Sequence, residues 1–268
     1  MTSDADDRQY HLDIVPGDVA DTVLLPGDPD RVDIVTDRWD DAEMVAEHRE
    51  YRTATGTYAG APLSVTSTGI GSPSTAIAVE ELARVGAETF LRVGSCGALQ
   101  PDMDVGDLVI TTGAVRGEGT SEEYVREDYP AVADHAVVSA LVAAAERLGY
   151  DYHCGVTMST DSFYAGQARE GFDGFEAAGS ESLLDDLRAA NVKNVEMEAS
   201  SILTLATLYG LRAGAVCSVF ANRSTGEFRT EGEGRAAEVG SLAAALLHEM
   251  DDRRADAGAD AWHADLSL

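Results

Sequence analysis

Two arginines in this sequence stand inside or beside apolar segments that end in glycine. Arg92 lies within Phe-Leu-Arg-Val-Gly at residues 90–94, and Arg31 follows a Pro-Gly-Asp-Pro turn at residues 26–29. A guanidinium in a strand suited to a core needs an anion or an acceptor, because burying an unpaired charge is very costly. A structural ion pair with a carboxylate is the simplest interpretation of either arginine alone. Two of them beside glycine-rich strand ends favour an oxyanion site, where backbone amides and arginine forks bind phosphate.

Two further groups of polar residues could bind a ligand. Glu196 and Glu198 precede an apolar helix, and a carboxylate there could accept hydrogen bonds from ribose hydroxyls. Acidic residues are also common at helix N-termini, where they complement the dipole, and this simpler interpretation holds for the pair taken alone. Phe163, Gln167 and Arg169 could stack on a planar heterocycle and hydrogen-bond to it, although taken alone they are ordinary loop residues.

Motifs for several other chemistries are missing from the sequence. It contains no Walker loop, no GxSxG elbow and no HExxH, and the glycines at 113–119 do not match a dinucleotide fingerprint. The six histidines are isolated, and Cys96, Cys154 and Cys217 lack metal-ligand spacing. We therefore expect no cofactor, no zinc site and no disulfide framework, and we expect a reducing cytoplasm as the location.

Strands and helices that alternate along the chain must position these residues. Apolar runs and turn signals predict strands at 23–25, 62–68, 89–93, 107–112, 154–158 and 213–220, and helices at 74–85, 134–148, 199–209 and 234–250. Ser74 is the expected N-cap of the first helix, and Gly149 and Gly210 are the expected ends of the second and third. Residues 162–182 read as a mobile loop or flap. The alternation predicts one α/β domain with helices on both faces of a sheet, followed by an acidic, flexible tail at 251–268.

The chain of 268 residues is strongly acidic, with 48 acidic and 19 basic side chains and a net charge of −29. This charge argues against nucleic-acid binding and against attraction to an anionic membrane. Residues 1–7 lack the features of a signal peptide, and no apolar run approaches the ~20 residues of a membrane span. Lys193 is the sole lysine. The acidic charge and the lack of lysine together favour adaptation to molar salt, where the Debye length is ~3 Å, over an ordinary acidic protein.

The sequence resembles the nucleoside phosphorylase family I, and within it the members that cleave uridine. The matching segments occur in the family's order from about residue 10 to 248: residues 25–32 (Leu-Pro-Gly-Asp-Pro-Asp-Arg-Val), 48–50 (His-Arg-Glu), 67–75 (Ser-Thr-Gly-Ile-Gly-Ser-Pro-Ser-Thr), 90–94, 97–101 (Gly-Ala-Leu-Gln-Pro), 105–107 (Val-Gly-Asp), 163–167 (Phe-Tyr-Ala-Gly-Gln), 196–198 (Glu-Met-Glu) and 222–223 (Asn-Arg). Any one segment is weak, but together they are highly specific. The resemblance implies a nucleoside phosphorylase domain at residues 1–250, with three α/β/α layers around a mixed central sheet.

The resemblance also implies roles for individual positions. Phosphate would be bound by Gly27, Arg31, Arg92 and Ser95, with Arg49 reaching in from a neighbouring subunit. Ribose would be bound by Met197 and Glu198, with His11 from the neighbour. The base would be bound by Gly97, Phe163, Gln167, Arg169 and Arg223, and a potassium ion by Glu50, Ile70 and Ser74. Arg92, Glu198 and Arg169 would be the catalytic residues.

The implied reaction is the reversible phosphorolysis of uridine to uracil and ribose 1-phosphate in pyrimidine salvage, with phosphate as a co-substrate. The implied assembly is a homohexamer of dimers with shared active sites. Two departures from the family pattern matter. Ser95-Cys96 replaces the usual pair of threonines, and residues 219–223 (Val-Phe-Ala-Asn-Arg) lack the aspartate typical of members that act on purines. Cleavage of guanosine or inosine remains an alternative, and a catalytically inactive nucleoside-binding protein is a second one.

Overall fold

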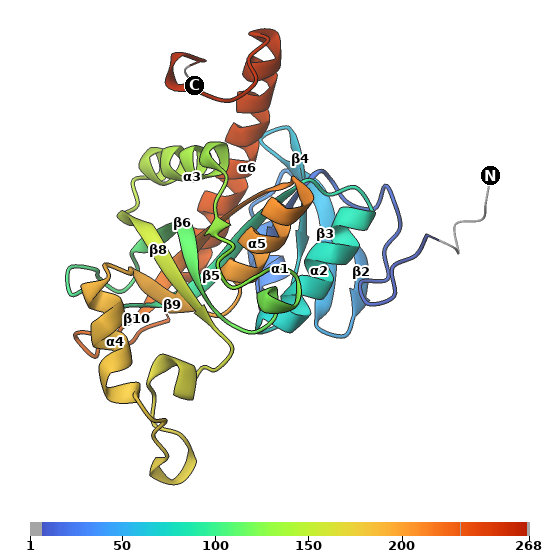
Figure 1. Ribbon diagram of the computed structural model, residues 1–268. Helices are drawn as coiled ribbons and strands as arrows, with labels where there is room; N and C mark the ends of the chain where they lie inside the picture. Colours follow the sequence, from blue (N-terminus) through green and yellow to red (C-terminus); the bar gives the residue numbers. More distant parts are fainter. Residues whose placement is uncertain (1–6, 231, 267–268) are drawn as a thin grey trace.

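The computed structural model describes residues 7–230 and 232–266 (Figure 1). The centre of this part of the chain is one mixed sheet of ten strands in the order β10-β6-β8-β9-β5-β1-β4-β3-β2, with β7 paired to β6. The strands are β1 (Thr22–Leu25), β2 (Asp41–His48), β3 (Tyr51–Tyr58), β4 (Ala61–Thr66), β5 (Thr89–Ala98), β6 (Leu108–Gly117), β7 (Ala131–Val132), β8 (Tyr152–Thr160), β9 (Asn194–Glu196) and β10 (Arg212–Asn222).

Part of the sheet closes on itself. Strand β10 pairs in parallel with β5 and antiparallel with β6, and β8 and β9 complete the ring between β6 and β5. Strands β4 and β1 then run parallel to β5 on its other side. The carboxyl ends of β1, β5 and β10 therefore meet at one edge, which is where ligands bind in α/β sheets.

Helices cover both faces of the sheet (Figure 1). They are α1 (Arg31–Thr36), α2 (Ser72–Arg84), α3 (His135–Leu148), α4 (Ser180–Ala189), α5 (Ala199–Tyr209) and α6 (Glu233–Asp256). Buried residues of α1, α3 and α6 form one hydrophobic cluster with the sheet, and those of α2 and α5 form another. The predicted single α/β domain with three layers and a mixed sheet is thereby confirmed.

Each predicted strand and helix corresponds to one in the structure, with differences at the ends. Gly149 and Gly210 end α3 and α5 with a φ of 70° each, as left-handed helix ends do. The prediction of Ser74 as an N-cap is wrong, because α2 begins two residues earlier, after Gly71. The Ser74 hydroxyl instead donates back to the carbonyls of Gly71 and Ile70.

Other predicted boundaries also shift. The segment 162–182 contains the 3₁₀ turns Ala165–Gln167 and Phe172–Gly174 and the first residues of α4, so the end of the expected loop is helical. Helix α6 continues to Asp256, so the expected start of the tail at residue 251 falls inside a helix. Beyond it, Trp262 packs against the cluster of α3 and α6, and its carbonyl lies 3.1 Å from His135 Nε2. Residues 1–6 of the expected domain and 267–268 of the expected tail lie outside the described residues.

In the part of the chain that the structure describes, no helix combines the length and the apolar character that a membrane crossing needs.

Candidate active site

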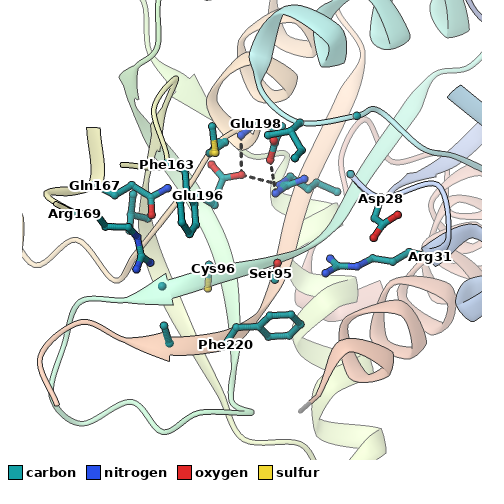
Figure 2. Close-up of a pocket in the computed structure, with 18 of the residues that line it drawn as sticks. Asp28, Arg31, Ser95, Cys96, Phe163, Gln167, Arg169, Glu196, Glu198 and Phe220 are labelled. Atoms are coloured by element: carbon teal, nitrogen blue, oxygen red, sulfur yellow. Dashed lines mark hydrogen bonds and ion pairs between the residues drawn. The ribbon is translucent and has the colours of Figure 1, made fainter. Parts of the chain in front are cut away.

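A cavity of about 600 Å³ opens where β1, β5 and β10 end (Figure 2). Eleven of the candidate site residues named from the sequence line this cavity, and they come from loops and strands distant in sequence: Gly27, Arg31, Ile70, Arg92, Ser95, Gly97, Phe163, Gln167, Arg169, Met197 and Glu198. The remaining lining residues are Asp28, Pro29, Gly69, Cys96, Val195, Glu196, Phe220, Ala221 and Phe228. The fold therefore brings most of the candidate residues into one cavity.

Arg92 lines this cavity, and its side chain is only 5% exposed. Its Nε donates to Glu196 Oε2 at 2.7 Å, and its Nη2 lies 2.5 Å from Glu198 Oε2 (Figure 2). The guanidinium folds back over its own strand, where a Cβ at Gly94 would lie only 2.8 Å from Nη2. Nη1 is buried and has no hydrogen-bond partner among the described residues. The structural ion pair is therefore present, and the Nη1 amino group of the same side chain remains without a partner among these residues.

Glu196 anchors both Arg92 and the start of α5. Its two carboxylate oxygens accept hydrogen bonds from Arg92 Nε, the Ser159 hydroxyl, and the backbone amides of Glu198 (2.9 Å) and Ala199 (3.0 Å). Every one of these partners is a donor, so the position requires a group that only accepts, such as an ionised carboxylate. The side chain is fully buried. Glu196 thus satisfies free amides of the helix start and fixes the arginine at the same time.

Glu198 lies beside Arg92 with its carboxylate bridging two elements. Oε1 accepts from the backbone amide of Gly71 at 2.6 Å, and the Ser72 hydroxyl donates to the carbonyl of Met197 at 3.1 Å. Burial raises the pKa of Glu198, Arg92 lowers it, and the nearby Glu196 raises it, with a net increase. Burial lowers the pKa of Arg92, but the charges of Glu198 and Glu196 outweigh this effect and raise it. The guanidinium therefore stays charged.

The loop after β1 and the end of β5 form one end of the cavity. Gly27 passes close to the neighbouring loop, since a Cβ there would lie 3.2 Å from the carbonyl oxygen of Gly69. Arg31 reaches from the start of α1 toward Ser95 on β5 (Figure 2). Its guanidinium carbon lies 5.6 Å from the centre of the Phe220 ring. A guanidinium, a hydroxyl and nearby backbone amides are the groups that bind phosphate.

Phe163, Gln167 and Arg169 form the other end of the cavity (Figure 2). The Arg169 guanidinium lies over the Phe163 ring at 4.4 Å from its centre. Gln167 is only 4% exposed, although it follows an exposed loop. Arg169 Nε is buried without a hydrogen-bond partner among the residues described. An aromatic face, an amide and a guanidinium can together recognise a flat base with carbonyl oxygens.

Arg223 supports this end of the cavity from behind and does not line it. Its Cγ would lie 3.4 Å from a Cβ at Gly97, and its Nη2 donates to the carbonyl of Ala168 at 3.2 Å. Burial lowers the pKa of Arg169, and burial followed by the charges of Arg169 and Arg188 lowers that of Arg223. Two partly desolvated cations near each other favour a ligand atom that carries negative charge.

Two predicted residues lie away from this cavity. His11 Nδ1 is 2.6 Å from Glu81 Oε1, and Arg49 lies over the ring of Tyr10, 5.8 Å from its centre. The rings of Tyr10 and His11 are themselves 4.8 Å apart, so the two predicted residues share one cluster. The 72% exposure of Tyr10 places this cluster at the surface. Neither His11 nor Arg49 lines the cavity of its own subunit.

The three predicted potassium ligands also lie in one region. A Cβ at Gly69 would lie 2.9 Å from Glu50 Cγ and 3.2 Å from Ser74 Oγ, and Ser74 Oγ is 3.3 Å from the Ile70 carbonyl. Carboxylate, hydroxyl and carbonyl oxygens are ligands that hard cations prefer. Across residues 7–230 and 232–266, no group of three or more His, Cys, Asp or Glu side chains could hold a metal ion.

The sequence model of the Phosphorylase superfamily matches residues 21–250. This chain belongs to that superfamily. A uridine phosphorylase of Thermococcus kodakarensis is 59% identical over 255 residues, which are 95% of this chain and 92% of the relative. A guanosine phosphorylase of Halorubrum lacusprofundi is 48% identical over 219 residues, 82% of this chain and 86% of the relative. A uridine phosphorylase of Escherichia coli is 43% identical over 221 residues, 81% of this chain and 87% of the relative.

Some cavity residues of this member of the Phosphorylase superfamily were not predicted from the sequence, or were predicted in another role. Glu196 was named only as a possible ribose ligand, and its pairing with Arg92 had a signal, because a buried arginine needs a carboxylate. Phe228 had none: a hairpin brings it beside Ala221, and the two residues form an isolated bridge. Phe220 also had none, because its direction depends on the irregular register of β10.

Proposed function

We propose that the chain catalyses the reversible phosphorolysis of uridine to uracil and ribose 1-phosphate, the reaction for which its 59% identical relative from Thermococcus kodakarensis is named. The observation that carries the proposal is one cavity with two differently equipped ends. Arg31 and Ser95 lie toward one end, Gln167 and Arg169 lie toward the other, and Arg92 lines the same cavity (Figure 2). Their spacing along one cavity suits a phosphate and a base held on either side of a ribose.

In this reaction an oxygen of phosphate forms a bond to C1′ of the ribose while the bond from C1′ to N1 of uracil breaks. The electrons of the broken bond leave with the base, and negative charge spreads to its carbonyl oxygens. Arg169 and Gln167 would stabilise that charge. Glu198 and Met197 would hold the ribose, and phosphate beside the positively charged C1′ would stabilise the transition state. Holding the two reactants in line supplies much of the remaining acceleration.

Uracil is favoured as the base because residues 219–223 (Val-Phe-Ala-Asn-Arg) lack the aspartate that family members acting on purines usually carry in this stretch. Without a carboxylic acid at this position, the ring nitrogen of a purine has no such proton donor. Guanosine is the second candidate, because the guanosine phosphorylase of Halorubrum lacusprofundi is 48% identical and guanine also presents an oxygen and a ring N–H. A catalytically inactive nucleoside-binding protein is disfavoured, since its phosphate residues would not need to be retained.

The experiment is to follow uridine, guanosine and inosine with and without inorganic phosphate. We expect phosphate-dependent release of uracil at the highest kcat/KM of the three. Faster phosphate-dependent cleavage of guanosine or inosine would identify a purine nucleoside as the substrate in place of uridine. Binding without turnover of any nucleoside would favour the inactive nucleoside-binding protein.

We also propose a homohexamer of dimers in which His11 and Arg49 complete the neighbour's ribose and phosphate sites. Their position at the surface, away from the cavity of their own subunit, supports this exchange.

The oxygens of Glu50, Ile70 and Ser74 would contribute to a structural potassium site at the dimer interface. A cytoplasmic location is consistent with the free thiols of the three cysteines. Light scattering at high salt tests the assembly, and an active monomer would refute shared sites.

A further inference from the structure

Two of the cavity arginines each have a phenylalanine ring beside the guanidinium. Arg169 lies over Phe163 at the base end, and Arg31 lies over Phe220 at the phosphate end, with distances of 4.4 Å and 5.6 Å to the ring centres. The second pair joins elements far apart in the sequence, the start of α1 and the end of β10. In Figure 2 the Phe220 ring extends beneath Ser95 on the side of the cavity where Arg31 enters.

An irregularity of β10 places Phe220 there. Along the pairing of β10 with β5, Val219 is opposite Cys96 and Ala221 is opposite Gly97, so Phe220 is one extra residue on its strand. In a regular strand, neighbouring side chains point to opposite faces. The extra residue breaks this alternation, and both Phe220 and Ala221 line the cavity. The backbone amide of Arg229 donates to the Phe220 carbonyl at 2.9 Å, which fixes the irregularity from the following hairpin.

We propose that Phe220 is a positioning residue for phosphate, which acts by holding the Arg31 guanidinium in its binding orientation. This inference rests on the proposed function only for the identity of the reaction. Arginine stacks readily on aromatic faces. A carboxylate partner would also orient the guanidinium but would bring a negative charge, whereas the Phe220 ring carries no net charge. A long side chain that is already ordered loses less conformational entropy when the anion binds.

The alternative is that Phe220 serves only as a wall of the base or ribose site. The two roles predict different kinetic effects. A residue that acts through Arg31 affects the affinity for phosphate, whereas a wall for the nucleoside affects the KM for uridine. The ordering cost of one flexible side chain corresponds to about a three- to tenfold change in affinity.

The experiment measures inorganic phosphate binding by isothermal titration calorimetry at fixed potassium chloride, together with KM for phosphate and for uridine. We expect Phe220→Leu to weaken phosphate binding about three- to tenfold, with KM for uridine changed less than about twofold. Phe220→Tyr keeps the aromatic face and is expected to bind phosphate within about twofold of the parent. Phe163→Leu is the matched control at the other Arg–Phe pair, and is expected to raise KM for uridine and leave phosphate affinity unchanged.

A double-mutant cycle then tests whether Phe220 acts through Arg31. In an Arg31→Ala background, Phe220→Leu should change the affinity for phosphate by less than about 1.5-fold. Any of three outcomes would overturn the inference: an unchanged affinity for phosphate in Phe220→Leu, an equal loss of phosphate affinity in both backgrounds, or a change confined to KM for uridine. If Phe220→Leu does not fold, Phe220→Met keeps apolar volume without the ring and answers the same question. Calorimetry reports on phosphate even if the protein cleaves no uridine, so the two proposals can fail separately.

Discussion

Removing the Arg92 guanidinium should destabilise the protein as well as inactivate it. If Arg92 served only as a phosphate ligand, Arg92→Ala would abolish turnover with little loss of folding stability. In the structure its charge lies between the carboxylates of Glu196 and Glu198, and the three side chains are at most 5% exposed. Breaking a buried pair by removing one partner costs about 3–5 kcal/mol. We therefore expect the free energy of unfolding to fall by about that amount.

The pH dependence of this loss identifies its cause. Burial and Glu196 already raise the pKa of Glu198, and Arg92 is the group that counteracts them most. Without Arg92 that pKa rises further in the folded state and not in the unfolded chain. The folded variant then binds more protons than the unfolded one, so its stability falls as pH rises from the carboxyl's ordinary pKa toward its folded value. The difference from the parent protein should therefore be smaller at about pH 5 than at about pH 8.

Urea unfolding at fixed, high potassium chloride measures both quantities. Arg212→Ala is the matched control, because Arg212 pairs with Asp251 at 2.8 Å with both side chains 30% exposed. Such a pair contributes about 0–1 kcal/mol, and the loss should depend little on pH in this range. A variant at position 92 as stable as the control variant, or equally unstable at both pH values, would refute the buried-charge argument.

Three further outcomes follow from the same geometry. Glu196→Gln should lower the free energy of unfolding in urea by about 1–3 kcal/mol and should lower kcat/KM, because the new amide nitrogen would face only donors. An unchanged free energy of unfolding would mean that the carboxylate charge is not needed. Arg169→Gln should lower kcat for uridine about 10²-fold, and less for 5-fluorouridine, whose base is a better leaving group; equal losses would remove Arg169 from leaving-group stabilisation. Lowering potassium chloride from about 2 M to about 0.01 M should reduce the Tm, because the net charge of −29 is then unscreened; a constant Tm in thermal melts would contradict adaptation to salt.

The sequence predicts the buried strands well and the edge of the sheet poorly. Strands such as β1 and β5 are mostly apolar and buried because both of their faces are covered. Strand β2 (Asp41–His48) is mostly exposed, so its residues show no alternation, and its pairing with β3 sets its place. The three-residue strand β9 is hidden for a different reason: it is buried between β8 and β5 but is too short to give a periodic signal.

Candidate site residues are recognisable where a charge stands in an apolar segment. Arg92 is visible in this way, but the sequence cannot identify which of 48 carboxylates pairs with it. That choice depends on β9 and β5 becoming neighbours, which brings Glu196 to Arg92 across 104 positions. Phe220 is hidden for a related reason, because one extra residue in the register of β10 decides which way its side chain points.

The charges of the cavity explain why a second subunit should matter for phosphate. The described lining residues include three arginines, Arg31, Arg92 and Arg169, and three carboxylates, Asp28, Glu196 and Glu198. Arg92 is closely held by two of those carboxylates, so this cavity is nearly neutral and not the strongly positive pocket that a count of arginines suggests. Phosphate brings up to two negative charges to a body with a net charge of −29. In the proposed assembly, Arg49 of a neighbouring subunit would supply a further cation, and the affinity for phosphate would then depend on assembly.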